Sequence, residues 1–535
     1  MKKVLVLHLV LFSVLFTQQD TVRSRIPEIE LPDFVITGQA QVDVPVQEKA
    51  TPELITPLSP EFILSRIGVE DLKLEGLTDP TKLQPSILDT SKKYYARAKL
   101  VAGLYSLPKT EVFYSGKISS VDINFGGDFE NIRDYVKYSR HSLLNLNALG
   151  SLIIEKEGEP PARLKLRTDF TRFSYYNFKA LNPDSVGKEV NSKFQIKSEF
   201  ENLFWREFNL SLGGQIEYQS LSRSGFSFFT FSPYGKLKST FEHFEITANV
   251  NPYLYKRSTW KTFNTLILNA NGEMYLRRLL KIINIIIGLD YQSERDDGKQ
   301  FLAPSASLGI GLSDYWSLSL FYSNKLLNYT PSQLWKINPY LDTVNYNYSI
   351  ERIKNKFGFS TIIYFTHLSN IKLEFARYDV AGKNIFIPKN SVQGFFNIVK
   401  RNVEVLDLNT SLFIDLNKSG NFILNINYIS SKLKDNTKNT PHTPNLNLNL
   451  TYTYKFEFPL YLRLSFLYYS RSYADINNQI SIDPTLNLSI GFNYMISDLI
   501  DLELGLNNIL NKNNERWFNY LQRPFDFELI LKLRF

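Results

Sequence analysis

The sequence predicts an all-β protein, a large transmembrane antiparallel β-barrel of about 22 strands, preceded by a short Pro-rich N-terminal periplasmic segment. Two alternating stretches carry this prediction. From residue 446 to residue 458 every even-numbered position is apolar or aromatic, while Asn and Thr fill most odd positions. The end of the chain repeats the pattern, with Phe527, Leu529, Leu531, Leu533 and Phe535 on one side and charged residues on the other. Side chains alternate across a strand, so each stretch has one apolar and one polar face.

The composition of the chain indicates whether the apolar face contacts protein or lipid. In a soluble sandwich it packs against a second sheet, whereas in an outer-membrane barrel it contacts lipid and the polar face lines a lumen. The 535 residues show no clear internal linker after residue 90, and the 31 Tyr and 40 Phe suit a barrel with aromatic girdles. The longest internal apolar run, around residues 279–289, is far shorter than the roughly 20 residues of a spanning helix. These features favour the barrel.

The N-terminus differs from the rest of the chain. Residues 1–19 combine two Lys with an apolar run, as in a secretory signal peptide, although the following residues lack the usual small-residue cleavage pair. Residues 20–90 hold eight of the 23 Pro, which cannot donate to a sheet ladder, so this segment is not barrel wall. One helix is expected from Ser59 to Gly68. Two interpretations stay open: a flexible periplasmic arm, or a segment that enters the lumen or binds a partner.

The barrel itself is expected over residues 91–535. Alternating stretches follow one another from Tyr94, separated by turn signals such as residues 182–184, 296–298 and 418–421. About 20 to 22 such segments fit the length needed to cross a bilayer obliquely, and an even number favours 22. The links at residues 241–244 and 313–317 are short, and those at 328–348 and 432–443 are long. Short turns are expected on the periplasmic side and long loops outside.

The second half of the chain resembles the TonB-dependent outer-membrane receptors. The residues that carry the resemblance are Pro331–Trp335, Asn338–Leu341 and Tyr348–Glu351 in the long link, a strand pair at Phe396–Asn397 and Val403–Val405, the segment Thr440–Pro444 before a strand, and Leu506–Lys512 before the terminal Phe535. Each motif is weak alone, but their order over residues 320–535 is specific. The resemblance implies a solute receptor in the outer membrane.

The resemblance also assigns roles to the two ends of the barrel chain. Residues Leu31–Gly38 look like the family's energy-coupling box, so Asp33, Phe34, Val35, Ile36, Thr37 and Gly38 are the expected docking segment for TonB or another partner. Residues 43–46 resemble the start of a plug domain, but only about fifty residues separate them from the first strand, so the plug is expected to be missing or truncated. In the family, a last strand such as Phe527, Leu529, Leu531, Leu533 and Phe535 is the signal for the barrel-insertion machinery; alternatively, Phe535 only faces lipid.

Catalytic and metal-binding patterns are absent from the sequence. The five His are scattered without ligand spacing, there is no Cys, and neither a GxSxG nor an HExxH motif occurs. We therefore expect no enzyme activity, no cofactor and no metal. The pairs Gly126–Gly127 and Gly213–Gly214 lie in strand-like stretches and are interpreted as bulges or crowded wall positions. The formal charge of +8 is spread along the chain, which makes nucleic acid an unsuitable partner.

These observations predict a barrel for binding or passage of a solute at the outer membrane. The expected partners are outer-membrane lipid, the insertion machinery, and TonB or a separate plug or periplasmic protein. A second interpretation is a non-transporting barrel that anchors or assembles a periplasmic or surface protein, because the apolar Phe34–Ile36 run suits strand addition to a partner's sheet. Without a plug the lumen of such a barrel is wide, so the arm, the long loops or a second protein must narrow it.

Overall fold

The computed structural model describes residues 95–535, except for residues 157–158, 180–186, 206–207, 242–243, 258–264, 280–282, 295–299, 343–348, 367, 390–393 and 417–418. The expected signal peptide, the Pro-rich segment with its expected helix at Ser59–Gly68, and the expected docking segment Asp33–Gly38 lie outside the described residues. Two turn signals, at 182–184 and 296–298, also lie outside them.

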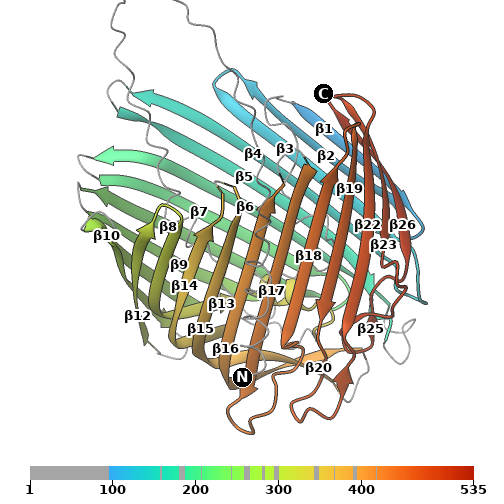
Figure 1. Ribbon diagram of the computed structural model, residues 1–535. Coiled ribbons are helices and arrows are strands. Elements are labelled where there is room, and N and C mark those ends of the chain that lie inside the picture. Colours follow the sequence, from blue (N-terminus) through green and yellow to red (C-terminus); the bar gives the residue numbers. More distant parts are fainter. Residues whose placement is uncertain are drawn as a thin grey trace, which may run out of the picture. The chain divides into compact units, whose positions relative to one another are not determined.

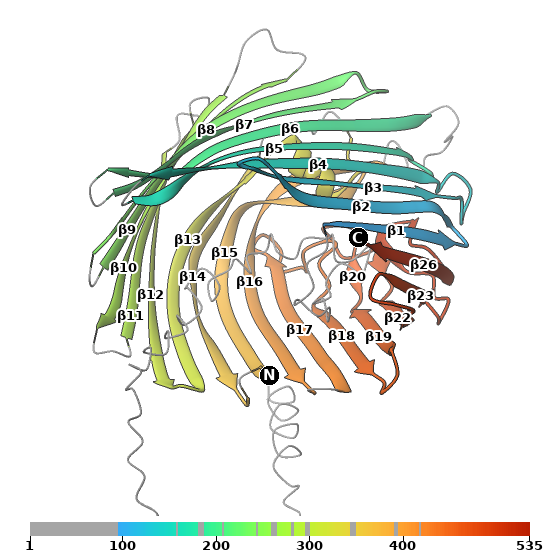
Figure 2. The same cartoon turned by 90° about the horizontal axis from the view of Figure 1, so that it is seen from above.

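One sheet of 22 antiparallel strands makes up the described chain. Each strand pairs with the next barrel strand in sequence, and the first strand also pairs with the last, so the sheet closes into a barrel. Figures 1 and 2 show the sheet curving round until the first and last strands lie side by side. The predicted fold class and strand number are confirmed.

The strands are β1 (Ala96–Gly103), β2 (Ser106–Ile118), β3 (Val121–Ile132), β4 (His141–Lys156), β5 (Glu159–Tyr176), β6 (Lys188–Trp205), β7 (Phe208–Leu221), β8 (Phe226–Thr240), β9 (Phe244–Arg257), β10 (Thr265–Leu279), β11 (Ile283–Glu294), β12 (Gln300–Ser313), β13 (Trp316–Tyr329), β14 (Ser349–Tyr364), β15 (Asn370–Pro388), β16 (Phe396–Asp415), β17 (Gly420–Leu433), β18 (Leu446–Lys455), β19 (Leu460–Tyr469), β22 (Thr485–Met495), β23 (Ile500–Asn507) and β26 (Asp526–Arg534). Two small hairpins lie in loops: β20 (Ser472–Tyr473) pairs with β21 (Ser481–Ile482), and β24 (Glu515–Trp517) pairs with β25 (Tyr520–Leu521).

The alternation read from the sequence gives the barrel two different faces. On β26, Phe527 and Leu529 are exposed on the outer face, while Asp526 and Glu528 are buried on the inner face. The same parity holds round the sheet, where exposed large side chains such as Leu302 point outward. An apolar exposed surface that encircles the molecule is far larger than soluble proteins carry. Lipid is therefore the environment that this outer face fits.

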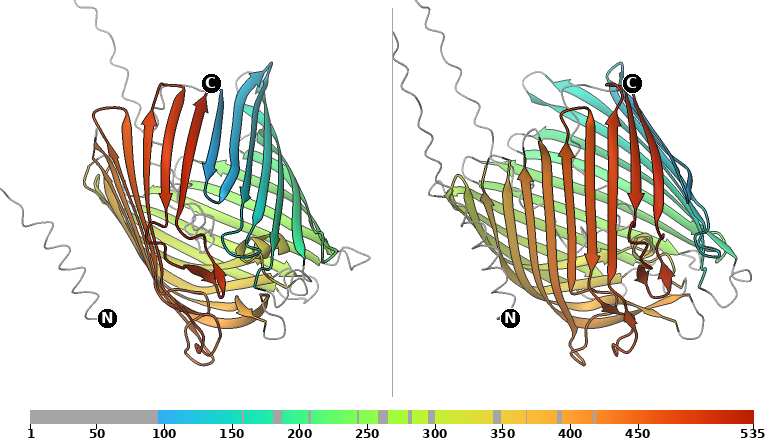
Figure 3. Two further views of the ribbon diagram at one scale, coloured as in Figure 1. Left: turned by 90° about the vertical axis from the view of Figure 1, so that its right-hand side faces the viewer. Right: turned by 45° about the vertical axis from the view of Figure 1, so that its right-hand side comes forward.

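The two ends of the barrel differ in the length of their links. At one end, the short-turn end, consecutive strands are joined by two to five residues. The chain also terminates there, since the Tyr95 amide donates to the Phe535 carbonyl at 2.8 Å. At the opposite end, the long-loop end, lie the extended links after β13, β17, β19 and β23, which gather together in Figure 3. The predicted asymmetry of short and long links is confirmed.

On the outer face of β15 the apolar band ends before the strand does. Ile371, Leu373 and Phe375 are followed on the same face by Arg377 and Asp379. Here the Arg377 guanidinium lies 2.5 Å from the Glu404 carboxylate, and Lys434 lies 2.8 Å from Asp379. Strands β14 to β17 thus extend beyond the apolar band toward the long-loop end. The ends of these strands nearest the long loops therefore lie outside the apolar band and support those loops.

Three details correct or refine the expectations. The long link after β13 contains a helix that was not expected, α5 (Pro331–Ile337), and the strand pair expected at Phe396–Asn397 and Val403–Val405 is one continuous strand, β16. Thr330 caps the helix: its hydroxyl accepts from the Gln333 amide at 3.3 Å, and the Gln333 side chain accepts from the Thr330 amide at 2.7 Å. Of the two Gly pairs, Gly126, Gly127 and Gly213 lie at crowded wall positions rather than bulges, whereas no atom comes closer than 3.8 Å to a Cβ on Gly214. A Cβ on Gly213 would come within 2.6 Å of the Ser198 carbonyl.

Candidate functional site

The candidate site is the inner wall of the barrel together with the loops over its long-loop end. On β1 to β9 the inner wall carries ion pairs between neighbouring strands. They include Lys99–Glu111 at 3.0 Å, Lys165–Glu201 at 2.6 Å, Lys193–Glu217 at 3.0 Å and Lys238–Glu245 at 3.1 Å. In each of these pairs a cation meets an acid of the neighbouring strand, so the two charges balance one another within the wall.

The strands that close the barrel carry the most buried charges. Arg534 on β26 forms an ion pair with Asp501 on β23, and both side chains are buried. Glu503 lies 3.0 Å from Arg463 and 2.5 Å from Lys532. The charged residues of the last strand therefore face inward and pair across strands, as the sequence predicts. A shift in strand register would separate these pairs and leave buried charges without partners, which is energetically costly. The pairs therefore fix the register next to the β1–β26 closure.

A different surface covers the inner wall from β16 to β22. Three consecutive cross-strand rows contain no Asp, Glu, Lys, Arg or His, and we call this surface the amide wall. Its rows are Asn409–Asn427–Asn447–Tyr469–Thr485, Ser411–Asn425–Asn449–Leu467–Asn487 and Phe413–Ile423–Thr451–Ser465–Ser489. Amides and hydroxyls, rather than charges, thus line this part of the lumen.

Aromatic side chains meet over the long-loop end. Tyr520 of β25 stacks on Tyr340, with ring centroids 3.5 Å apart and planes inclined by 16°. Phe178, in the loop after β5, packs edge-on against Tyr520 at 4.9 Å, and Phe396 at the start of β16 lies 6.2 Å from it. We call these four residues, with Tyr175 of β5, the cap. Burial raises the pKa of Tyr340 and of Tyr520, so both stay neutral.

Hydrogen bonds fix the rings of the cap to loop backbone. The Tyr520 hydroxyl donates to the Gly394 carbonyl at 2.5 Å, and the Tyr175 hydroxyl donates to the Pro339 carbonyl at 2.6 Å. The Trp335 indole N–H of α5 donates to Tyr175 at 3.3 Å. Tyr520 and Tyr175 are thus each tied to the backbone of another link, and the two carbonyls have the partners that burial requires.

The cap spans the mouth of the barrel. In the closed order of 22 strands, β5 and β16 lie eleven positions apart, which is half of the way round the sheet. Residues from both sides nevertheless touch Tyr520, which belongs to the loop between β23 and β26. Loops from opposite sides of the barrel can meet only by crossing its mouth. The cap thus bridges the long-loop end from one side of the barrel to the other.

A second aromatic group continues the cap. The His442 ring, in the loop after β17, lies 5.6 Å from Phe396 and 4.8 Å from Trp517 of β24. Both ring nitrogens of His442 are buried, and burial, together with the nearby Arg516, lowers its pKa to about 3. At neutral pH the ring is uncharged and packs as an aromatic side chain.

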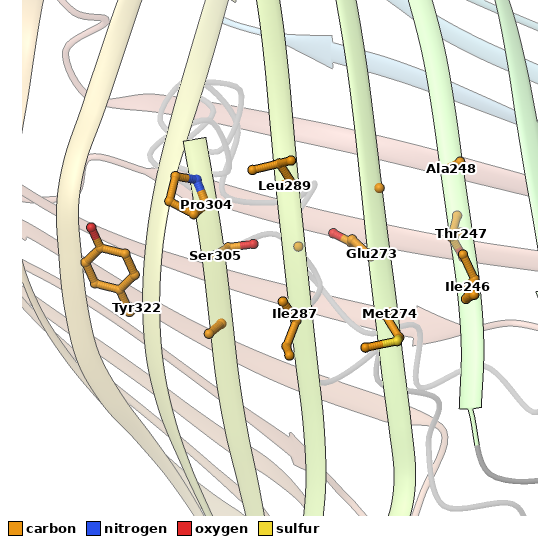
Figure 4. Close-up of a pocket in the computed structure, with 13 residues that line it drawn as sticks. Ile246, Thr247, Ala248, Glu273, Met274, Ile287, Leu289, Pro304, Ser305 and Tyr322 are labelled. Carbon is orange, nitrogen blue, oxygen red and sulfur yellow. The ribbon is translucent and has the colours of Figure 1, made fainter. Parts of the chain in front are cut away.

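A recess lies elsewhere, on the outside of the wall. It has a volume of about 580 Å³ and is lined by β9 to β13, whose side chains stand next to one another in Figure 4. Most of its lining residues, among them Ile246, Met274, Ile287 and Leu289, point outward on the apolar face. Small residues such as Gly272 open this space. The recess is therefore part of the lipid-facing surface and not of the solute site.

Of the site residues expected from the sequence, the structure describes only those of the last strand. The docking segment Asp33–Gly38 lies outside the described residues and stays a prediction, as does the role of the last strand in insertion. Phe527, Leu529, Leu531, Leu533 and Phe535 do share the outer face at the strand's end. The cap was missed, because its aromatic residues are spread over loops far apart in sequence. Their only sequence signal was the density of aromatic residues in the long links.

The described part of the chain lacks two features. No group of three or more His, Asp or Glu side chains there could hold a metal ion. Among the same residues, no helix is both long enough and apolar enough to cross a membrane.

Solved structures identify the fold. The chain matches the siderophore receptor PirA from Acinetobacter baumannii with a TM-score of 0.63 and 13% identity, covering 83% of this chain and 81% of that one. The FrpB iron transporter from Neisseria meningitidis matches with a TM-score of 0.64, 12% identity and coverage of 87% and 83%. BauA, the ferric preacinetobactin receptor from Acinetobacter baumannii, matches with a TM-score of 0.64, 12% identity and coverage of 83% and 80%.

No protein-family model and no curated protein sequence matches the chain. At such low identity the structural matches establish the fold and not the ligand. The resemblance to TonB-dependent receptors is thus confirmed as a shared barrel architecture.

Proposed function

We propose that the chain is an outer-membrane barrel of the receptor type, which binds a solute and lets it cross the outer membrane without catalysis. The observation that supports this most is the combination of a polar inner wall with a mouth that the loops themselves cover. An anchor would need neither. A polar lumen bounded by a cap of neutral aromatic residues is suited to controlled passage, since the cap separates the lumen from the exterior until its contacts are released.

The fold suggests an orientation for this function. Short turns face the periplasm and long loops face outward in barrels of this kind, so the cap lies on the outer side and Phe535 lies at the periplasmic side. In this proposal residues 1–19 direct export, and the insertion machinery recognises the last strand. Asp33–Gly38 would then reach TonB or a separate plug protein from the periplasm.

Planar-bilayer recording tests the proposal. The wild-type protein is compared with Tyr340→Ala/Tyr520→Ala, each with and without residues 20–90. We expect the cap variant to conduct more than wild type, and most when the N-terminal segment is also deleted, because both barriers are then removed. Tyr315→Ala/Tyr494→Ala is the matched control, since both rings are exposed at the short-turn end. A cap variant that stays closed even without residues 20–90 contradicts a transport function.

A further inference from the structure

The amide wall has the dimensions of a binding surface for a chain-like solute. It spans five neighbouring strands and three rows. Strand spacing of about 4.8 Å and a same-face repeat of about 6.8 Å give an area of roughly 19 Å by 14 Å. Six amide side chains lie within it. On the described wall from β1 to β9, by contrast, the inner face carries the ion pairs described above.

The chemistry of the amide wall is matched to hydroxyl groups. An Asn side chain offers two N–H donors and a carbonyl acceptor, and a sugar hydroxyl likewise both donates and accepts. Removing water from an amide costs much less than removing it from a charge, so a neutral solute can replace water here at small cost. The ring faces of Phe413 and Tyr469 lie at the edges of the wall. Aromatic rings of this kind pack against the apolar faces of sugar rings.

Part of the hydrogen-bonding capacity of the wall is already used to hold it in place. Asn409 donates to Asp407 at 2.9 Å, Asn427 donates to Asn409, and Asn447 donates to Asn427 at 3.5 Å. The carbonyl oxygen of Asn447 is buried without a partner among the described residues, and Asn425 is exposed on the lumen side. The first row is thus positioned by its own contacts. The second row, at Asn425 and Asn449, is left to meet a solute.

We propose that the amide wall binds a neutral, polyhydroxylated solute, such as an oligosaccharide, inside the lumen. This inference rests on the proposed solute-binding function and names its ligand class. Charge argues against an anionic chain as the ligand, because each carboxylate would lose water on this surface and meet no cation within the three rows. The next residue of the second row, Lys372 on β15, is already paired with Glu374 at 3.5 Å. The ion-paired wall opposite gives no compensation, since its cations are opposed by acids.

Titration calorimetry on the purified full-length protein tests the inference. The probes are maltohexaose and cellohexaose, which are neutral, and hexagalacturonate, which has the same number of rings with a carboxylate on each. We expect saturable binding of at least one neutral chain and binding of hexagalacturonate at least tenfold weaker. The variant Asn425→Ala/Asn449→Ala removes an in-register pair at the centre of the wall and should weaken binding of the neutral chain at least tenfold.

The control carries the same change elsewhere on the inner wall. Asn249 and Asn271 are an in-register pair on β9 and β10, hydrogen-bonded at 2.7 Å, and their replacement by Ala should leave the affinity unchanged. If the double variant Asn425→Ala/Asn449→Ala does not fold, the single variant Asn425→Ala replaces it, with a smaller expected loss of affinity for the neutral chain. The inference is overturned if neither neutral chain binds, if hexagalacturonate binds equally well, or if both Asn pairs have equal effects. Calorimetry measures binding and does not require the solute to cross the barrel. If binding fails but the bilayer conductance behaves as expected, the proposed transport function stands and only this ligand class is excluded.

Discussion

Tyr520 is the residue through which the cap is best tested. Its ring is 4% exposed, it stacks on Tyr340, and its hydroxyl donates to the Gly394 carbonyl. Replacement of a buried aromatic residue by Ala costs about 3–5 kcal/mol. If this loss falls on the closed cap, the open fraction rises about a hundred- to several thousand-fold, since each 1.4 kcal/mol is tenfold. Tyr520→Phe keeps the ring and loses one buried hydrogen bond, about 1–2 kcal/mol, so about a tenfold rise is expected.

Hydrogen exchange measures this opening without any transport step. The reporter is the peptide over residues 331–342, which contains α5 and the buried Leu334. Its amides are protected by helical bonds such as Asn338 to the Leu334 carbonyl at 3.0 Å, and they exchange when the cap opens. We expect faster exchange in the order wild type, Tyr520→Phe, Tyr520→Ala.

The control for this experiment is Tyr315→Ala, at an exposed ring in the short turn between β12 and β13. It removes a Tyr of the same size from the opposite end of the barrel. The reasoning is refuted if exchange over residues 331–342 is the same in Tyr520→Ala as in wild type, or if Tyr315→Ala accelerates it equally. In either case the aromatic contacts would not hold the loops together.

Three further predictions concern packing, pH and assembly. Gly213→Ala should destabilise the barrel by about 1–3 kcal/mol through overpacking. Gly150→Ala is the control and should not, because nothing lies within 4 Å of a Cβ at that position. Equal urea unfolding midpoints for the two variants would contradict this prediction. Lowering the pH from 7 to 5 should loosen the cap by about 2 kcal/mol, because the closed-state pKa of His442 is about 3 against 6.5 when exposed, so stability present above pH 6.5 is lost as pH falls toward 3. Hydrogen exchange that depends equally on pH in His442→Phe would exclude this cause. Phe535→Ala should slow insertion of the barrel with little change in its stability, since the Phe535 side chain is exposed and the contact to Tyr95 is made by the Phe535 carbonyl. Pulse-labelled assembly measures the insertion rate. An unchanged rate would count against the role of the last strand as an insertion signal.

The strands could be predicted because their determinant is local. On β18 and β26 a period of two separates lipid-facing from lumen-facing side chains, and this pattern survives in each strand without knowledge of its neighbours. The helix α5 also had a local signal that was overlooked. Thr330 and Gln333, three residues apart, form a capping box, and Pro331 stands at the first helical position. A search for caps inside the long link would have found it.

The cap could not be predicted in the same way. Its contacts join Tyr175, Tyr340 and Tyr520, which are separated by more than 150 residues at each step, and no periodicity relates them. The amide wall is an intermediate case. The run of Asn on alternate positions of β18 is visible in the sequence, but its alignment with Asn on β16 and β17 depends on register. Register is fixed by turn length and by the ion pairs near the closure, both of which are known only from the fold.

Closure of the sheet is what turns these separate features into one site. Because β1 pairs with β26, the links after β5, β13 and β23 are held around a single mouth at fixed separations. An open sheet with the same sequence would keep its alternation and its Asn rows but would leave Phe178 and Phe396 far apart. The aromatic residues of the long loops therefore acquire partners only after the first and last strands have met. For this reason the cap and the amide wall depend on the strand number as much as on their own residues.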